Sequence, residues 1–155
     1  MTTLEAYAEP DALPRSEAGR IGLLLGLEQG RTVDDVGLAE RIAEGLAPAA
    51  AMALVRVLGR STVIDKIIPE ATLRRARKNR RALSREMSER LYEVGRVVDA
   101  VSRAYHGDKV AISRFLHQPH ALLGGRTPLE MARLSSAGTE AVLKLLRRAE
   151  YGFAV

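Results

Sequence analysis

Apolar residues recur at steps of three and four along most of the chain, and no stretch alternates apolar and polar residues for long enough to form a strand. The pattern therefore predicts an all-α fold. The most regular stretch is a long helix from about Ser84 to His106, which Gly107 ends in a left-handed conformation. Its apolar positions form one continuous seam, which consists of Met87, Leu91, Val94, Val98, Val101 and Tyr105. We expect the seam to pack inside the chain, where the helix connects two helical lobes, and a homodimer seam stays open as the alternative.

Capping residues, prolines and glycines divide the region before the long helix into four short helices. Ser61 is expected to cap the third of these helices, which by residue number span about 34–44, 48–58, 62–67 and 70–78. Residues 1–32 differ from this region, because prolines and glycines are scattered through them. We interpret them as a flexible arm or a fraying helix.

After the long helix, local signals predict three further helices. An amphipathic helix spans about 108–117 and is followed by a tight loop at Gly124 and Gly125. A capping box with proline at the first helical position, residues 127–130, starts the next helix. The last helix spans about 137–151 and stops at a glycine.

Composition narrows the classes of function. A chain of 155 residues with 46% hydrophobic residues can form a core without metal or disulfide support. The absence of cysteine excludes disulfides, thiolate zinc sites and cysteine nucleophiles, and it fits a reducing compartment. The N-terminus lacks a basic leader, and the apolar run from Ile21 to Leu27 is far shorter than the ~20 residues that a membrane span needs. We therefore expect a cytoplasmic protein that does not contact the membrane.

Positive charge is concentrated in one window. Between Arg60 and Arg85 there are nine basic and two acidic residues, a net charge of +7, whereas the whole chain carries +5. A basic stripe of this kind is typical of proteins that bind the phosphate backbone of nucleic acids. A solvated helix face has the same composition, so the charge alone leaves both interpretations open.

The same window has the anatomy of a helix-turn-helix. Between Leu58 and Asn79, a short helix, a tight break and a short arginine-rich helix follow one another. In this arrangement Thr72 and Arg75 face the base edges, because they come early in the second helix. The residues that suit phosphates are Arg74, Arg77, Lys78, Arg80 and Arg81.

Other candidate sites are weaker. The loop Gly124-Gly125 with Arg126 could hold an anion at a helix N-terminus, but no Walker lysine follows, and capping explains each residue. His117 and His120 cannot share a metal on one helix face, because a proline lies between them. No nucleophile with an ordered base and no carboxylate pair stands out, so we expect neither an enzyme nor a bound cofactor.

Two segments resemble a known family. IPEATLRRARKNRRALSREMSERLYEV resembles the Xre-like helix-turn-helix of the ParS/MbcA/Xre antitoxins, and FLHQPHALLGGRTPLEMARLSSAGTEAVLKLLRRAEYGFAV resembles their C-terminal toxin-binding domain. The second segment reproduces the order of the family in full, whereas the first has Met87 where the family has serine. The resemblance covers about residues 35–155 and implies an Xre-like helix-turn-helix domain (33–106) and a small helical toxin-binding domain (107–155), joined by the long helix. The N-terminal arm (1–32) lies outside it.

The resemblance also implies a function. Its partner would be a RES-domain toxin, a small protein that consumes NAD or uses it to ADP-ribosylate a target. The antitoxin would be a non-catalytic homodimer that occludes the active site of the toxin with its C-terminal region and represses its own operon. The toxin-binding residues would be Gly124, Gly125, Arg126, Arg148, Tyr151, Gly152, Phe153 and Val155. A stand-alone helix-turn-helix regulator and a small helical enzyme are the alternatives.

Overall fold

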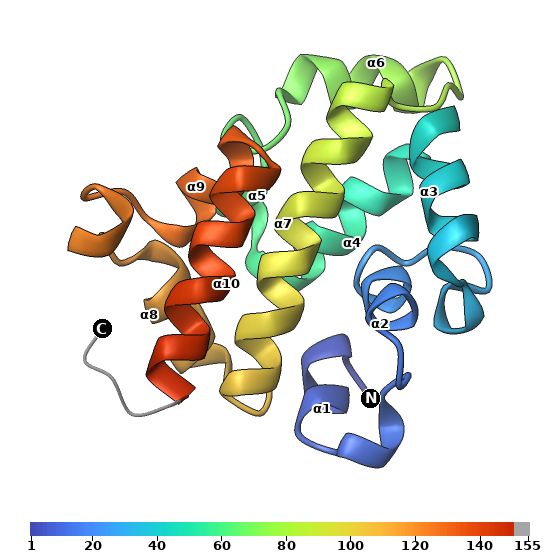
Figure 1. Cartoon of the computed structure of the whole chain (residues 1–155). Coiled ribbons are helices and arrows are strands. Elements are labelled where there is room, and N and C mark those ends of the chain that lie inside the picture. The colour runs from blue at the N-terminus through green and yellow to red at the C-terminus, as the bar shows by residue number, and fades with distance from the viewer. Residues whose placement is uncertain (151–155) are drawn as a thin grey trace. The chain divides into compact units, whose positions relative to one another are not determined.

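The computed structural model of the chain describes residues 1–150 and is all-α, with no β-strand in this part of the chain (Figure 1). The α-helices are α1 (Thr3–Tyr7), α2 (Glu17–Leu24), α3 (Asp35–Glu44), α4 (Pro48–Leu58), α5 (Arg60–Val63), α6 (Glu70–Lys78), α7 (Arg85–Ala104), α8 (Lys109–His117), α9 (Pro128–Leu134) and α10 (Ser136–Glu150). Single 3-10 turns form η1 (Pro10–Ala12), η2 (Gly30–Thr32) and η3 (Ala121–Leu123). Among the described residues, no helix is both long enough and apolar enough to cross a membrane.

The chain divides into two compact units. Unit 1 contains residues 1–13 together with the chain from residue 96 onward, and unit 2 contains residues 14–95. The boundary between Gly95 and Arg96 falls inside α7, so this helix contributes its first half to unit 2 and its second half to unit 1.

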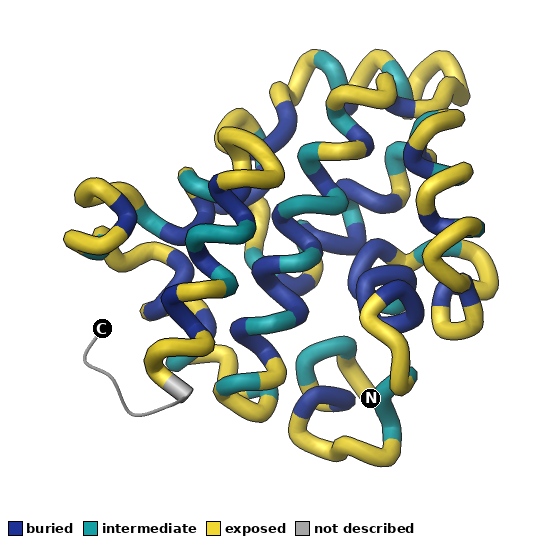
Figure 2. Tube along the Cα trace, in the orientation of Figure 1, coloured by how far each residue is buried: buried dark blue, intermediate teal, exposed yellow. Residues whose placement is uncertain are grey.

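The long helix carries the predicted seam. Leu91, Val94, Val98 and Val101 are buried, whereas Met87 and Tyr105 at the two ends are partly exposed (Figure 2). The seam is therefore part of the chain's own core, as expected, and it does not offer a surface to a second copy. The helix ends at Ala104, two residues before the predicted end, and the chain leaves it through two left-handed residues, His106 and Gly107.

Local capping chemistry explains most of the other helix starts. The side chain of Asp34 accepts from the Gly37 amide at 2.7 Å at the start of α3, and Asp108 accepts from two amides at the start of α8. Thr127 accepts from the Glu130 amide at 3.1 Å at the start of α9, which has proline in its first turn. Each bond satisfies an amide that has no partner within its own helix, so these predicted starts are confirmed.

The predicted third helix is wrong over most of its length. We expected Ser61 to cap residues 62–67, but α5 is a single turn that begins at Arg60 and includes Ser61. The chain then turns at Asp65, which has a φ of 65° and donates its amide to the Ile68 carbonyl at 2.7 Å. The Asp65 carboxylate also accepts from the Glu70 amide at 2.8 Å. Asp tolerates the left-handed conformation, so one residue both ends the helical run and caps α6.

The interpretation of residues 1–32 as a flexible arm or fraying helix is also wrong. Tyr7 of α1 and Ile21 and Leu24 of α2 are buried. Gly22 and Gly30 lie so close that a Cβ on either would overlap the backbone of the other. The glycines therefore allow α2 to pack directly on η2, and they do not mark disorder.

The core of unit 2 forms where α2 packs against α3 and α4. On α7, Gly95 lies beside Ile21 and Leu25, which are fully buried. Ser88 of α7 is also fully buried, and its hydroxyl accepts from the Leu46 amide and donates to the Ser84 carbonyl, each at 2.8 Å. These contacts hold α7 against the link between α3 and α4.

Candidate functional site

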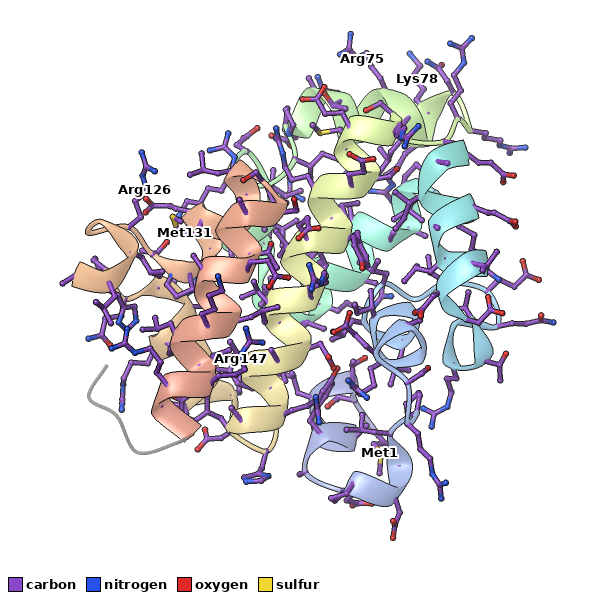
Figure 3. The ribbon with its side chains drawn as sticks, in the orientation of Figure 1. Met1, Arg75, Lys78, Arg126, Met131 and Arg147 are labelled. Carbon is purple, nitrogen blue, oxygen red and sulfur yellow. The ribbon has the colours of Figure 1, made fainter. Side chains whose placement is uncertain are left out.

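Helix α6 presents the predicted DNA-binding cations to solvent. Its one buried residue is Leu73, which faces the core of unit 2. Thr72 is half-buried, and the exposed cations of the helix form what we call the basic face, which consists of Arg74, Arg75, Arg77 and Lys78. Figure 3 shows the side chains of Arg75 and Lys78 projecting away from the ribbon. No cation of this face is needed to fill the core, so all four are available to a partner.

The remaining two predicted cations follow the helix. Arg80 has a φ of 51°, and the Arg81 amide donates to the Ala76 carbonyl at 2.9 Å, which closes the C-terminal end of α6. Both side chains are exposed. They extend the positive charge beyond Lys78 but lie in a turn, not on the helix.

A surface pocket between α5 and α6 gathers three members of the basic face. It has a volume of about 490 Å³ and is lined by Arg60, Ile64, Glu70, Leu73, Arg74, Arg77 and Lys78. Arg60 donates to Glu70 at 2.9 Å across it. Arg60 belongs to the basic window, but nothing local in the sequence indicates its role, because its place beside α6 depends on the turn at Asp65.

Two contacts fix the position of α6 within unit 2. Helix α4 packs against both α5 and α6. The Arg90 guanidinium of α7 donates to the Ile67 carbonyl at 3.1 Å, and so it holds the segment that leads into α6. The helix and its basic face are thus a defined surface of unit 2, and they do not depend on the flexibility of a loop.

In unit 1, the region predicted to bind the toxin is a small helical layer. Helix α10 packs against α9 and η3, and α9 also packs against α8. The buried apolar residues of this layer are Ile112, Phe115, Leu116, Leu123, Leu129, Ala132, Val142, Leu145 and Leu146. Gly138 permits the tightest contact, because a Cβ there would overlap the backbone carbonyl of Met131 on α9 (Met131 is labelled in Figure 3).

The predicted glycine loop is closed on itself. We call residues 120–126 the closed loop, because the His120 amide donates to the Arg126 carbonyl at 3.1 Å and the Gly125 amide donates back to the His120 carbonyl at 2.9 Å. Gly124 and Gly125 have φ values of 65° and 79°, which few other residues adopt. The ring of His120 packs on Phe115 with centroids 5.3 Å apart, and this contact joins the loop to α8.

The other predicted toxin-binding residues come from different places. Arg126 is exposed at the end of the closed loop, and its side chain points away from the ribbon in Figure 3. Arg148 is exposed in the last turn of α10. The further predicted residues, which are Tyr151, Gly152, Phe153 and Val155, lie outside the described residues.

Sequence reasoning missed the polar contacts that hold unit 1 together. The buried Tyr7 hydroxyl donates to Asp99 of α7 at 2.7 Å, and Arg96 of α7 pairs with Glu140 of α10 at 2.9 Å. The first pair is separated by 92 positions and the second by 44. Nothing local in the sequence indicates such pairs, because only the folded chain brings these residues together.

His117 and His120, the pair considered as metal ligands in the sequence, have different surroundings. His117 Nδ1 lies 2.8 Å from the Ser113 carbonyl one helical turn earlier, whereas His120 packs on Phe115. Residues 1–150 contain no cluster of three His, Cys, Asp or Glu side chains that could hold a metal ion.

Comparison with known proteins assigns one of these regions. No curated protein matches the chain. Residues 102–152 match the family model of the antitoxin Xre/MbcA/ParS C-terminal toxin-binding domain, a range that covers α8, η3, α9 and α10. The match includes the closed loop and excludes the basic face of α6. Residues 102–152 therefore form a domain of the Xre/MbcA/ParS C-terminal toxin-binding family.

Proposed function

We propose that this protein binds and neutralises a RES-domain toxin, an enzyme that consumes NAD or transfers ADP-ribose from it. The observation that carries the proposal is the toxin-binding domain at residues 102–152. The choice of a RES toxin follows the resemblance of the chain to antitoxins of RES systems. In this proposal the protein acts by binding alone, and its C-terminal residues from Tyr151 to Val155 enter the active-site cleft of the toxin.

Co-expression tests this proposal. The RES-domain protein encoded beside this gene should arrest growth when expressed alone, and co-expression of this chain should restore growth and yield a stable complex. Truncation after Gly152 should release toxicity, because it removes Phe153 and the Val155 carboxylate, which would enter the toxin cleft. A neighbouring gene without a RES product, or no complex with that product, would indicate a stand-alone regulator.

We further propose that the protein represses its own operon as a homodimer. The basic face of α6 supports DNA binding, because its four cations are exposed while the buried Leu73 faces the core. Two copies would present two such helices to the half-sites of a palindromic operator. The seam of α7 is buried within the chain, so the dimer must use another surface.

Operator binding separates the two halves of the proposal. A gel shift with the DNA upstream of the gene should show a complex for the full chain and for the chain truncated after Gly152. Reversal of Arg74, Arg77 and Lys78 to Glu should abolish the shift without weakening toxin binding. Light scattering of the complex gives the number of copies, and a monomer on DNA would contradict the dimer.

A further inference from the structure

We propose that the closed loop of residues 120–126 is a preformed toxin contact, in which Leu122 enters an apolar socket on the toxin and Arg126 pairs with an acidic group beside that socket. The inference rests on the proposed antitoxin function, because it needs a toxin partner. It concerns residues 120–126 and not the C-terminal residues 151–155, so each segment can be varied independently.

Two adjacent leucines in the loop have opposite surroundings. Leu123 is 5% exposed and belongs to the core of the small helical layer, whereas Leu122 is 54% exposed. A leucine held this far in solvent gains little from folding, because the hydrophobic contribution scales with the apolar area that leaves water. The exposed apolar surface of Leu122 is therefore available for burial by a partner.

The loop holds Leu122 in a fixed position. Five backbone hydrogen bonds lie within residues 120–126, and they include the bonds of the Leu123 amide to His120 at 3.0 Å and of the Gly124 amide to Ala121 at 3.1 Å. Packing of His120 on Phe115 joins this frame to α8. A contact residue on a rigid frame loses little conformational entropy on binding, which is the advantage of a preorganised site.

The surface beside Leu122 is open. No atom of the described residues beyond the adjoining ones lies within 4 Å of the position that a Cβ would take at Gly124 or Gly125. The two glycines are therefore required by their positive φ and not by crowding from the rest of the chain. Because the loop carries no side chain at these two positions, the surface of a partner can approach its backbone closely.

Arg126 adds a charge to this surface. Its guanidinium is exposed and has no hydrogen bond or ion pair within residues 1–150. The fold therefore uses neither Leu122 nor the cation that follows the glycines. Arginine is enriched among interface hot spots, where a few side chains carry most of the binding energy, and burial of the exposed leucine beside it would remove further apolar area from water.

The toxin is the occupant that the observations favour. The closed loop lies inside the range that matches the toxin-binding domain, and no described contact of unit 1 covers Leu122. Leu134, at the end of α9 in the same domain, is equally exposed at 58% but has no closed loop around it. It serves as the matched control, because its substitution removes the same apolar area from the same domain.

Titration calorimetry of the full chain with the neighbouring RES-domain protein tests the inference. Leu122→Ser should raise the Kd about 30-fold, as expected for an interface hot spot, whereas Leu134→Ser should change it less than about twofold. Arg126→Ala should weaken binding about tenfold and make the Kd less dependent on salt, and Arg133→Ala should do neither. Circular dichroism should show all four variants folded, since each position is exposed.

The outcomes separate this inference from the proposed function. If the wild-type chain does not bind the RES-domain protein, the proposed function fails before any variant is compared. If the wild type binds and Leu122→Ser binds equally well, the closed loop is not a contact and the inference is overturned. Equal losses for Leu122→Ser and Leu134→Ser would also overturn it, because the effect would then follow the loss of any exposed leucine in the domain.

Discussion

The basic face of α6 and the closed loop of residues 120–126 are both exposed, but they are built in opposite ways. On α6, four exposed cationic side chains share the helix with one buried leucine, and none of their charged ends has a hydrogen bond or ion pair within residues 1–150. In the closed loop, five backbone hydrogen bonds fix the backbone that carries one exposed leucine and one exposed arginine. A surface of the first kind recognises charge and adapts to the geometry of its partner, whereas a surface of the second kind recognises shape.

The difference has a measurable consequence. Binding through α6 should weaken steeply as salt rises, because it depends on the release of counterions from phosphates. Binding through the closed loop should depend on salt only as far as Arg126 contributes, since the burial of Leu122 is insensitive to screening. Four predictions test the binding surfaces and the helices that support them.

The largest effect is expected for Val98→Asp, which breaks the helix that contributes to both units. Val98 is 0% exposed, so the new carboxylate would be buried without a partner at a cost of several kcal/mol. Thermal unfolding followed by circular dichroism should show a strong loss of stability. Arg103→Asp places the same group at an exposed position of α7 and should remain close to wild type. An unchanged midpoint for Val98→Asp would show that this face of α7 is not buried.

A smaller loss is expected for Tyr7→Phe, which tests whether residues 1–13 belong to unit 1. The change removes the hydrogen bond from the Tyr7 hydroxyl to buried Asp99 and should cost about 1–3 kcal/mol. Tyr105→Phe is the control, because it retains the ring contact with Phe115 at an exposed site. Denaturant unfolding measures both, and equal stability of the two variants would mean that Tyr7 does not support the unit.

The basic face should separate two kinds of DNA contact. Arg75→Ala should reduce the discrimination between the operator and unrelated DNA by about 1–3 kcal/mol if Arg75 contacts base edges. Lys78→Ala should weaken binding to all sequences alike and lower the salt slope by about 1. Gel shifts at two salt concentrations with both DNAs distinguish these results, and the reverse pattern would exchange the two roles.

The smallest effect is expected for the ion pair between Arg60 and Glu70, which lies beside the basic face. Glu70→Gln breaks the exposed pair with Arg60 and should change stability by less than about 1 kcal/mol. Glu140→Gln in unit 1 should cost more, because its partner Arg96 is largely buried and the two atoms are equally close. Chemical denaturation of both variants measures the difference, and a larger loss for Glu70→Gln would contradict it.

Local signals predicted most of the fold and part of the site. Helices α4, α6 and α8 begin and end within a residue of the predicted positions, because local residues set their starts: Pro48 opens α4, Pro69 precedes α6 and Asp108 caps α8. The prediction failed at Asp65, where a single left-handed residue replaced a turn of helix, and at Gly22, where a close contact with η2 was interpreted as disorder. At Asp65 the deciding interactions were hydrogen bonds within the turn itself, to Ile68 and Glu70, whereas at Gly22 the deciding contact was with the backbone of another segment.

The sequence by itself determined the helical class, the concentration of charge on α6 and the features of a toxin-binding domain, because each depends on residue type and short-range spacing. Only the tertiary structure decided that Leu123 is buried while Leu122 is exposed. It also decided that Tyr7 reaches Asp99 across 92 positions. Two adjacent leucines are equivalent in a pattern of apolar residues, and their difference arises from the direction in which the folded backbone points each side chain.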